Sequence, residues 1–172
     1  MLPISWMWDI LDEFLYQYQR FCEFKSKIAH RARSHEKKDS VKLDVNVLDA
    51  HPEIWESGEV LLSLKGLFNK TRGMRSEQSV YLGYFSQVQQ VRYQIMHGCY
   101  HEALETVSAM RDMGRKDALY YKSPPCHCSL YYYFGFALFA VGRYSDAQAI
   151  FNKILYEEFF RTKRISFRLI NH

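Results

Sequence analysis

Apolar side chains recur every three or four residues over most of the chain, which is the period of an α-helix with one buried face. A short helix is predicted over residues 43–51, a longer one from about Ile54 to Phe68, and a loop over 69–79. Met7 and Trp8 lie off the stripe of the first helix, so that helix is predicted to pack on more than one side. The stripe itself consists of Trp6, Ile10, Leu11, Phe14, Leu15, Tyr18, Phe21 and Cys22.

From residue 80 onwards, one pattern occurs twice with an offset of 44 residues. Gly98-Cys-Tyr100-His-Glu-Ala103 returns as Gly142-Arg-Tyr144-Ser-Asp-Ala147. Each copy follows an apolar helix, Tyr81 to Met96 or Leu130 to Val141, and opens a second helix that ends near Met113 or Phe160. The glycine suits the positive φ that ends a helix, the tyrosine is expected to fill the space beside the turn, and the alanine allows the two helices to pack closely.

The second copy also has a small residue, Gly135, before the turn and a large apolar residue, Phe151, after it. With Tyr144 and Ala147 these positions match the tetratricopeptide pattern, whereas Val91 and Val107 occupy them in the first copy. Residues 114–129 are predicted to be a linker that lengthens the repeat. The predicted fold class is all-α, with stacked antiparallel helical hairpins of tetratricopeptide-like type forming a right-handed solenoid.

Composition excludes several classes of protein. The 172 residues are 48% hydrophobic and include 12 Phe, 13 Tyr and 3 Trp, which argues against disorder. The most apolar run, Leu130 to Val141, is shorter than the ~20 residues of a membrane span, so we expect no membrane insertion. Four cysteines and no visible secretory signal predict a cytoplasmic protein.

The net charge is +4, and acidic and basic blocks alternate along the chain, with the largest basic excess over residues 20–42. Residues 20–42 carry eight bases and three acids, and residues 25–42 are predicted to be a frayed helix end that runs into a mobile loop. Its basic side chains are candidates for contact with RNA or the ribosome, although an ordinary solvated loop is the favoured interpretation. Tyr131 to Tyr133, Trp6, Trp8 and Trp55 are interpreted as core in preference to base-stacking or interface residues. The candidate contact residues are Lys25, Lys27, Arg31, Arg33, Lys37 and Lys38.

Two groups of metal-binding residue types occur, one at His97, Cys99 and His101 and one at Cys126, His127 and Cys128. A helix of about 13 residues separates them by about 20 Å, so one zinc ion cannot join them, and neither has paired C-x-x-C spacing. Cys99 as a nucleophile lacks an evident orienting acid. The adjacent acids of 12–13 and 157–158 diverge on a helix. We therefore expect no enzyme, no metal, no cofactor and no small-molecule substrate.

Four stretches taken in order resemble subunit L of eukaryotic translation initiation factor 3. The similarity spans roughly residues 4–163, and the Trp-x-Trp-Asp-x-x-Asp-Glu-Phe block at its start is the most specific part. The stretches are Ser5 to Gln19, His51-Pro-Glu-Ile-Trp55 with Val60 to Phe68, Tyr81-Leu-Gly-Tyr-Phe-Ser86, and Tyr131 to Ala137 continuing through Gly142 to Leu155.

The resemblance implies a non-catalytic scaffold whose helical repeats lead into a PCI domain that ends in a winged helix. It also implies assembly with other PCI subunits, notably K and E, on the small ribosomal subunit. On this basis residues 1–79 are N-terminal helices with a basic loop, 80–163 are two hairpins leading towards a PCI domain, and 164–172 are a divergent tail. The similarity ends after Lys163 without the winged helix, so we expect a fragment or a truncated gene model.

The sequence therefore favours a scaffold subunit of initiation factor 3 that acts through protein–protein contacts. Two alternatives stay open. One is a stand-alone tetratricopeptide-type adaptor that binds a peptide in its groove, and the other is a scaffold that contacts RNA through residues 25–42.

Overall fold

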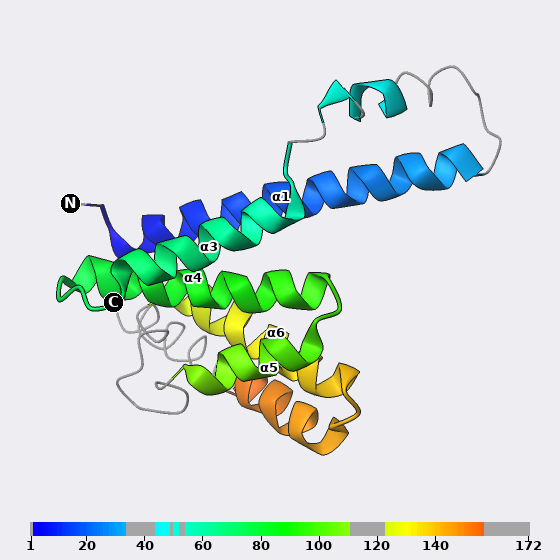
Figure 1. Cartoon of the computed structure of the whole chain (residues 1–172). Helices are drawn as coiled ribbons and strands as arrows, with labels where there is room; N and C mark the ends of the chain where they lie inside the picture. Colours follow the sequence, from blue (N-terminus) through cyan, green and yellow to red (C-terminus); the bar gives the residue numbers. More distant parts are fainter. Residues whose placement is uncertain (1, 34–43, 49, 52–53, 111–122, 157–172) are drawn as a thin grey trace, which may run out of the picture.

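The computed structural model describes residues 2–33, 44–48, 50–51, 54–110 and 123–156. Helices make up nearly all of these residues, and the described ranges contain no strand, which confirms the all-α prediction. Figure 1 shows the helices packed as a bundle of hairpins below one long N-terminal helix. The right-handed stacking and the division of the chain at residues 79 and 163 stay predictions.

The first helix, α1 (Ile4–Arg33), has 30 residues and is therefore about 45 Å long. The basic segment is helical as far as Arg33, and the mobile loop predicted after it lies outside the described residues. Met7 and Trp8 are buried, in line with the predicted packing beyond the stripe, but Trp6 and Ile10 of the stripe itself are 60% and 57% exposed. Packing on the central helix buries an arc through Met7, Trp8, Leu11, Leu15 and Tyr18, which leaves Trp6 and Ile10 on the flank.

Residues 44–48 and 50 are helical, and two longer helices follow, α3 (Ser57–Thr71) and α4 (Glu77–Met96). The helix predicted from Ile54 begins three residues later, because Trp55 has a positive φ of 53° that a right-handed helix does not accept. At its other end α3 runs on to Thr71, and the Ser76 hydroxyl caps α4 by accepting the Ser79 amide at 3.2 Å. The loop predicted over 69–79 is therefore only residues 72–76.

Helix α4 lies at the centre of the fold and contacts α1, α3, α5 and α6 (Figure 1). From Tyr81 onwards it is buried or half-buried on all sides, so apolar residues such as Phe85 and Val88 share its surface with the buried polar side chains of Gln89 and Arg92. The main core joins these residues to α1, α5 and α6. The N-terminal helices and the predicted hairpins therefore share one core.

The hairpin helices are α5 (Tyr100–Ala109), α6 (Pro124–Ala140) and a final helix over residues 144–156. Helix α5 ends short of Met113 because Met110 takes an extended conformation, with ψ near 98°. Helix α6 begins six residues before Leu130, so the prediction of a linker up to Ser129 was wrong over 124–129. Proline suits the first turn of a helix, where the missing amide is not needed. In the described ranges no helix has an apolar stretch of the length that a bilayer requires.

The turns after α4 and α6 have the same hydrogen bonds. In the first, the Gly98 and Cys99 amides donate to the carbonyls of Ile95 and Gln94 at 3.0 and 2.8 Å. In the second, Gly142 and Arg143 donate in the same register at 3.0 and 2.9 Å, to Phe139 and Leu138. This is the Schellman motif, and it requires the positive φ found at Gly98 (74°) and Gly142 (82°). The repeated sequence pattern thus produces a repeated turn.

Candidate protein-interaction surface

A buried polar network fixes α1 and α6 against α4. Arg92 of α4 donates from Nη1 to Asp12 Oδ1 at 2.8 Å and from Nη2 to Gln19 Oε1 at 2.9 Å, and Gln89 Nε2 donates to the same Asp12 oxygen at 3.1 Å. The Arg92 guanidinium also lies 5.7 Å from the ring centre of Tyr133 on α6. Burial raises the pKa of Tyr133, whereas the Arg92 charge opposes that rise. The network therefore serves to hold three helices in register.

A second polar cluster joins α1 and α4 to the start of α3. Tyr18 OH lies 2.8 Å from His97 Nε2, and the Tyr93 hydroxyl donates to the Ser57 carbonyl at 2.8 Å. Burial raises the pKa of Tyr18, so its hydroxyl stays protonated. The Ser57 hydroxyl is 3.4 Å from His97 Nε2, at the long end of the hydrogen-bond range. His97 Nε2 therefore bonds to Tyr18 in preference to Ser57, so the cluster joins helices and is not a serine–histidine catalytic pair.

The cysteine and histidine groups noted in the sequence do not form a metal centre in the described residues, where no set of three or more His, Cys, Asp or Glu converges. The Cys99 thiol faces the His97 carbonyl oxygen at 3.8 Å, and the imidazole of His97 contacts Tyr18. Cys126 is buried, which raises the pKa of its thiol well above the ordinary value. His127 is also buried, and its ring packs edge-on against Tyr131 at 4.8 Å.

The residues that the sequence pattern places in the hairpins lie at close helix contacts. Ala103 and Ala147 are almost fully buried. A Cβ atom on Gly135 would lie 2.7 Å from Phe151 Cε1, so the glycine is what allows α6 and the last helix to approach. In the first hairpin Val91 and Val107 are buried in the main core at the corresponding positions.

The two turn tyrosines differ. Tyr100 is half-buried, and its ring centre lies 6.3 Å from that of Phe136 on α6. Tyr144 is 63% exposed and touches Phe139 edge-on at 5.4 Å, so it does not fill the space beside its turn as predicted. The physical reason is that Tyr100 has the ring of Phe136 on the neighbouring helix α6 beside it, whereas Tyr144 opens the last helix of the described residues.

Four of the basic candidate residues are exposed on the last turns of α1, which extends past the ends of α3 and α4 in Figure 1. At 100° per residue these positions are spread around the helix and do not form one stripe. Lys37 and Lys38 lie outside the described residues. The four that are placed are Lys25, Lys27, Arg31 and Arg33.

An apolar groove runs between α1 and α3, with a volume of about 580 Å³. Its walls are Ile10 and Phe14 on α1 and Leu62 and Leu67 on α3. Ile10 and Leu62 are 57% and 60% exposed, and the neighbouring Trp6 is equally open. Large apolar side chains that gather around a groove are typical of an interaction site, whereas isolated ones are ordinary surface. We call this surface the α1–α3 groove.

A glycine and two charges complete the α1–α3 groove. Gly66 lines it from the middle of α3, and a Cβ atom there would meet no atom within 4 Å. Glu59 in the first turn of α3 and Lys70 in its last turn also line it. Within the described residues neither side chain has an ion-pair partner. The groove thus has an apolar floor with one charge of each sign at its ends.

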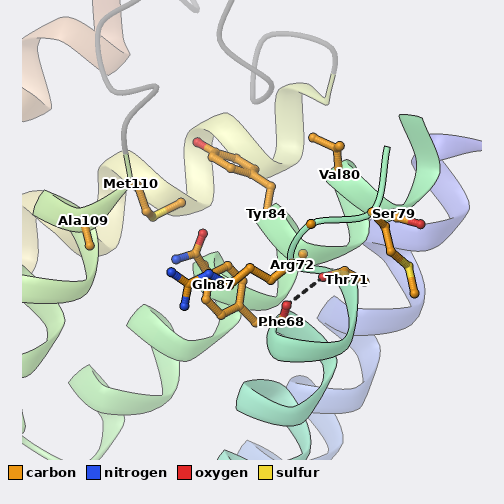
Figure 2. Close-up of a pocket in the computed structure, with 12 residues that line it drawn as sticks. Phe68, Thr71, Arg72, Ser79, Val80, Tyr84, Gln87, Ala109 and Met110 are labelled. Carbon is orange, nitrogen blue, oxygen red and sulfur yellow. Dashed lines mark hydrogen bonds between the residues drawn. The ribbon is translucent and has the colours of Figure 1, made fainter. Parts of the chain in front are cut away.

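A second hollow, also about 580 Å³, lies where α3, α4 and the end of α5 meet (Figure 2). Phe68, Arg72, Gln87, Tyr84 and Met110 surround it, and the Thr71 hydroxyl donates to the Phe68 carbonyl at 3.0 Å on its wall. Among the described residues, its lining contains no carboxylate and no histidine, and Arg72 is the one cation. These residues therefore offer apolar contact and a positive charge, not an acid–base pair.

Sequence reasoning missed the α1–α3 groove. It placed Trp6 and Ile10 in the core and did not single out Leu62 or Gly66. One signal was present, because a glycine in the middle of a helical pattern costs about 1 kcal/mol relative to alanine and calls for a packing or functional reason. Tyr131 to Tyr133 were all predicted to be core residues. Tyr131 is buried as predicted, whereas Tyr132 is exposed.

Comparison with known proteins identifies the family of this chain. Residues 1–170 match the family described as RNA polymerase I-associated factor PAF67, so the similarity continues beyond Lys163, where the sequence analysis ended it. The chain is 31% identical to eukaryotic translation initiation factor 3 subunit L of Homo sapiens and of Gallus gallus, over 90% of its own length, and 32% identical to that of Nematostella vectensis. It spans only 29% of the human protein's length and 31% of the Nematostella protein's length. Because the match covers almost every residue, the chain belongs to the family described as RNA polymerase I-associated factor PAF67.

Proposed function

We propose that this chain acts in translation initiation as a non-catalytic scaffold segment of the initiation factor 3 complex. The observation that carries the proposal is the similarity of 90% of the chain to proteins named as subunit L of that factor. The exposed apolar side chains on α1 and α3 support it, since a scaffold works by burying such surface against other proteins.

The finer parts of the proposal concern partners and place. The partners are other subunits of initiation factor 3, with K and E as the first to test, and the complex acts on the small ribosomal subunit in the cytoplasm. In this role the helices supply apolar faces, and the polar clusters at Arg92 and His97 keep those faces in register. No bond is made or broken by the chain itself.

Affinity purification tests the proposal. The tagged chain is expressed in cells of its own source, recovered under mild conditions, and its co-purifying proteins are quantified against an untagged control. Initiation factor 3 subunits and small ribosomal subunits are expected at levels comparable to the tagged chain. Recovery of chaperones or isolated peptides in their place would contradict the proposal and favour the tetratricopeptide-type adaptor.

One observation favours a second candidate, contact with RNA. The last turns of α1 carry exposed basic residues on a part of the helix that extends beyond its neighbours (Figure 1). Phosphate contacts make binding fall steeply with salt, by a slope of about 0.7 per phosphate for single strands. Replacing Lys25, Lys27, Arg31 and Arg33 with glutamine is expected to weaken binding of a single-stranded RNA and to flatten its salt dependence.

The matched control for this test is replacement with glutamine of four exposed bases on and just after α3, which are Lys65, Lys70, Arg72 and Arg75. That variant is expected to keep the affinity and the salt slope of the unaltered chain. Equal losses in both variants would reduce the effect to net charge and remove the case for a site on α1.

A further inference from the structure

The α1–α3 groove is formed by two helices whose facing side chains leave an open channel. Ile10 and Leu62 are more than half exposed although they are large and apolar, and Phe14 and Leu67 line the channel with them. Within the described chain, Ile10 and Leu62 therefore bury less than half of their surface. An apolar channel between two helices has the shape that accepts the apolar face of a third helix.

Gly66 strengthens this interpretation because its lack of a side chain serves no contact within the described chain. Gly83 and Gly135 are explained by neighbours, since a Cβ atom on either would lie under 3.0 Å from Thr71 or Phe151. At Gly66 the same atom would enter open space inside the groove. Glycine is the poorest helix former after proline, so its presence in the middle of α3 suits close approach of another backbone at that point.

The charges of Glu59 and Lys70 determine which end of an occupying helix should be basic and which acidic. Glu59 and Lys70 are 11 positions apart on α3, or about 16 Å along the helix axis, which equals about three helical turns. An occupying helix of that length gains most if a basic side chain lies beside Glu59 and an acidic side chain lies beside Lys70.

We infer that the α1–α3 groove binds one amphipathic helix of another subunit of the initiation factor 3 complex. The helix lies along α3 with its apolar stripe on Ile10, Leu62 and Leu67 and its backbone closest to Gly66. A base near one end of the stripe faces Glu59 and an acid near the other end faces Lys70. This inference rests on the function proposed above and names one surface through which that function works.

Gly66→Leu tests the inference, and Gly58→Leu is its matched control. Both glycines lie on α3, but Gly58 is exposed and outside the groove, where a Cβ atom would make only an ordinary contact at 3.9 Å with Glu56. Neither substitution touches the core, and leucine favours a helix more than glycine does, so both variants are expected to keep the helical signal and to melt no lower than the unaltered chain. Gly66→Leu is expected to reduce recovery of initiation factor 3 subunits about tenfold, whereas Gly58→Leu leaves it within about twofold.

A photoreactive amino acid at Leu62 identifies the occupant in the assembled complex. The expected cross-linked peptide comes from an initiation factor 3 subunit and has apolar residues at helical spacing between a basic and an acidic end. Cross-links to a second copy of this chain, to RNA, or to another segment of the same chain would overturn the inference.

The two failures are distinguishable. If the unaltered chain recovers no initiation factor 3 subunits, the proposed function fails. If it recovers them and Gly66→Leu recovers as many, the inference about the groove fails while the proposed function stands.

Discussion

Arg92 on α4 and Asp12 on α1 form an ion pair of 2.8 Å across 80 positions of sequence, with the arginine side chain 9% exposed and the carboxylate 42% exposed. Gln19, Gln89 and the Tyr133 ring complete the surroundings of the pair. This relationship fixes the rotation of α1 about its own axis. It thereby decides that Trp8 and Leu11 face the core and that Ile10 faces the α1–α3 groove.

We expect Arg92→Met to lower the free energy of unfolding by about 1–3 kcal/mol, because Asp12 and Gln19 lose a charged donor. The loss should fall below that of a fully buried pair, since the Asp12 carboxylate keeps part of its water. Urea unfolding followed by helical circular dichroism measures it. The control is Arg143→Met, which breaks the exposed Arg143–Asp146 pair and should cost under about 0.5 kcal/mol. Equal costs for the two variants would show that Arg92 is no more than a surface charge.

Gly135→Ala should destabilise the hairpin of α6 and the last helix. The added Cβ atom would lie 2.7 Å from Phe151 Cε1, so the ring or the helix must move, at about 1–3 kcal/mol. Gly66→Ala is the control, because its Cβ atom meets nothing and the change should stabilise α3 by up to about 1 kcal/mol. Combining Gly135→Ala with Phe151→Leu should cost less than the sum of the two single changes. Strict additivity in that cycle would contradict the contact.

Gly98→Ala and Gly142→Ala should each lower stability by about 1 kcal/mol or more, because alanine is strained at the positive φ of the Schellman turns. The two losses should be similar, since the turns share one hydrogen-bond pattern. Thermal unfolding of each variant measures the effect, with Gly58→Ala, inside α3, as a substitution that should not destabilise. A neutral result at Gly142 would mean that its turn opens readily in solution.

Burial raises the pKa of the Cys126 thiol well above its ordinary value of 9.0, so the folded protein holds this proton where the unfolded chain releases it. The resulting stability is complete below pH 9 and is lost as the pH rises through the folded pKa. Tyr133 contributes in the same direction. Urea midpoints measured between pH 8 and pH 10 should therefore fall for the unaltered chain.

Cys126→Ala separates the cysteine from the other groups. Its midpoint should be lower at pH 8, because a small cavity replaces the sulfur, but it should fall less between pH 8 and pH 10. Alkylation of the native protein provides an independent readout, since the half-buried Cys22, Cys99 and Cys128 should react before the buried Cys126. An unchanged pH slope in Cys126→Ala would assign the effect to the tyrosines.

Local sequence signals predicted much of the fold, and tertiary packing accounts for the differences. The glycines of the repeat anticipated the turns because a positive φ is a property of single residues. The apolar period predicted α1 as a helix, but it did not show which arc is buried, since Trp6 suits a core and an interface equally. The start of α6 was misjudged because Pro124 and Pro125 suit a loop and the first turn of a helix alike.

The candidate site was harder to predict than the fold. The α1–α3 groove depends on how two helices pair across some 50 positions of sequence, and the rotation of α1 is set by the ion pair between Arg92 and Asp12. Nothing in the sequence around Asp12 or Arg92 indicates that the two residues pair with each other. Gly66 alone gave a local signal, because glycine destabilises a helix interior and no neighbouring side chain requires it there.

The position of α4 has a consequence for how the chain unfolds. In a solenoid each repeat touches only its neighbours, so the repeats melt one after another from the ends. Here α4 touches α1, α3, α5 and α6, so none of these helices can separate without uncovering it. The described helices should therefore lose structure in one cooperative transition, and the amides in the middle of α4 should be the last to exchange with deuterium.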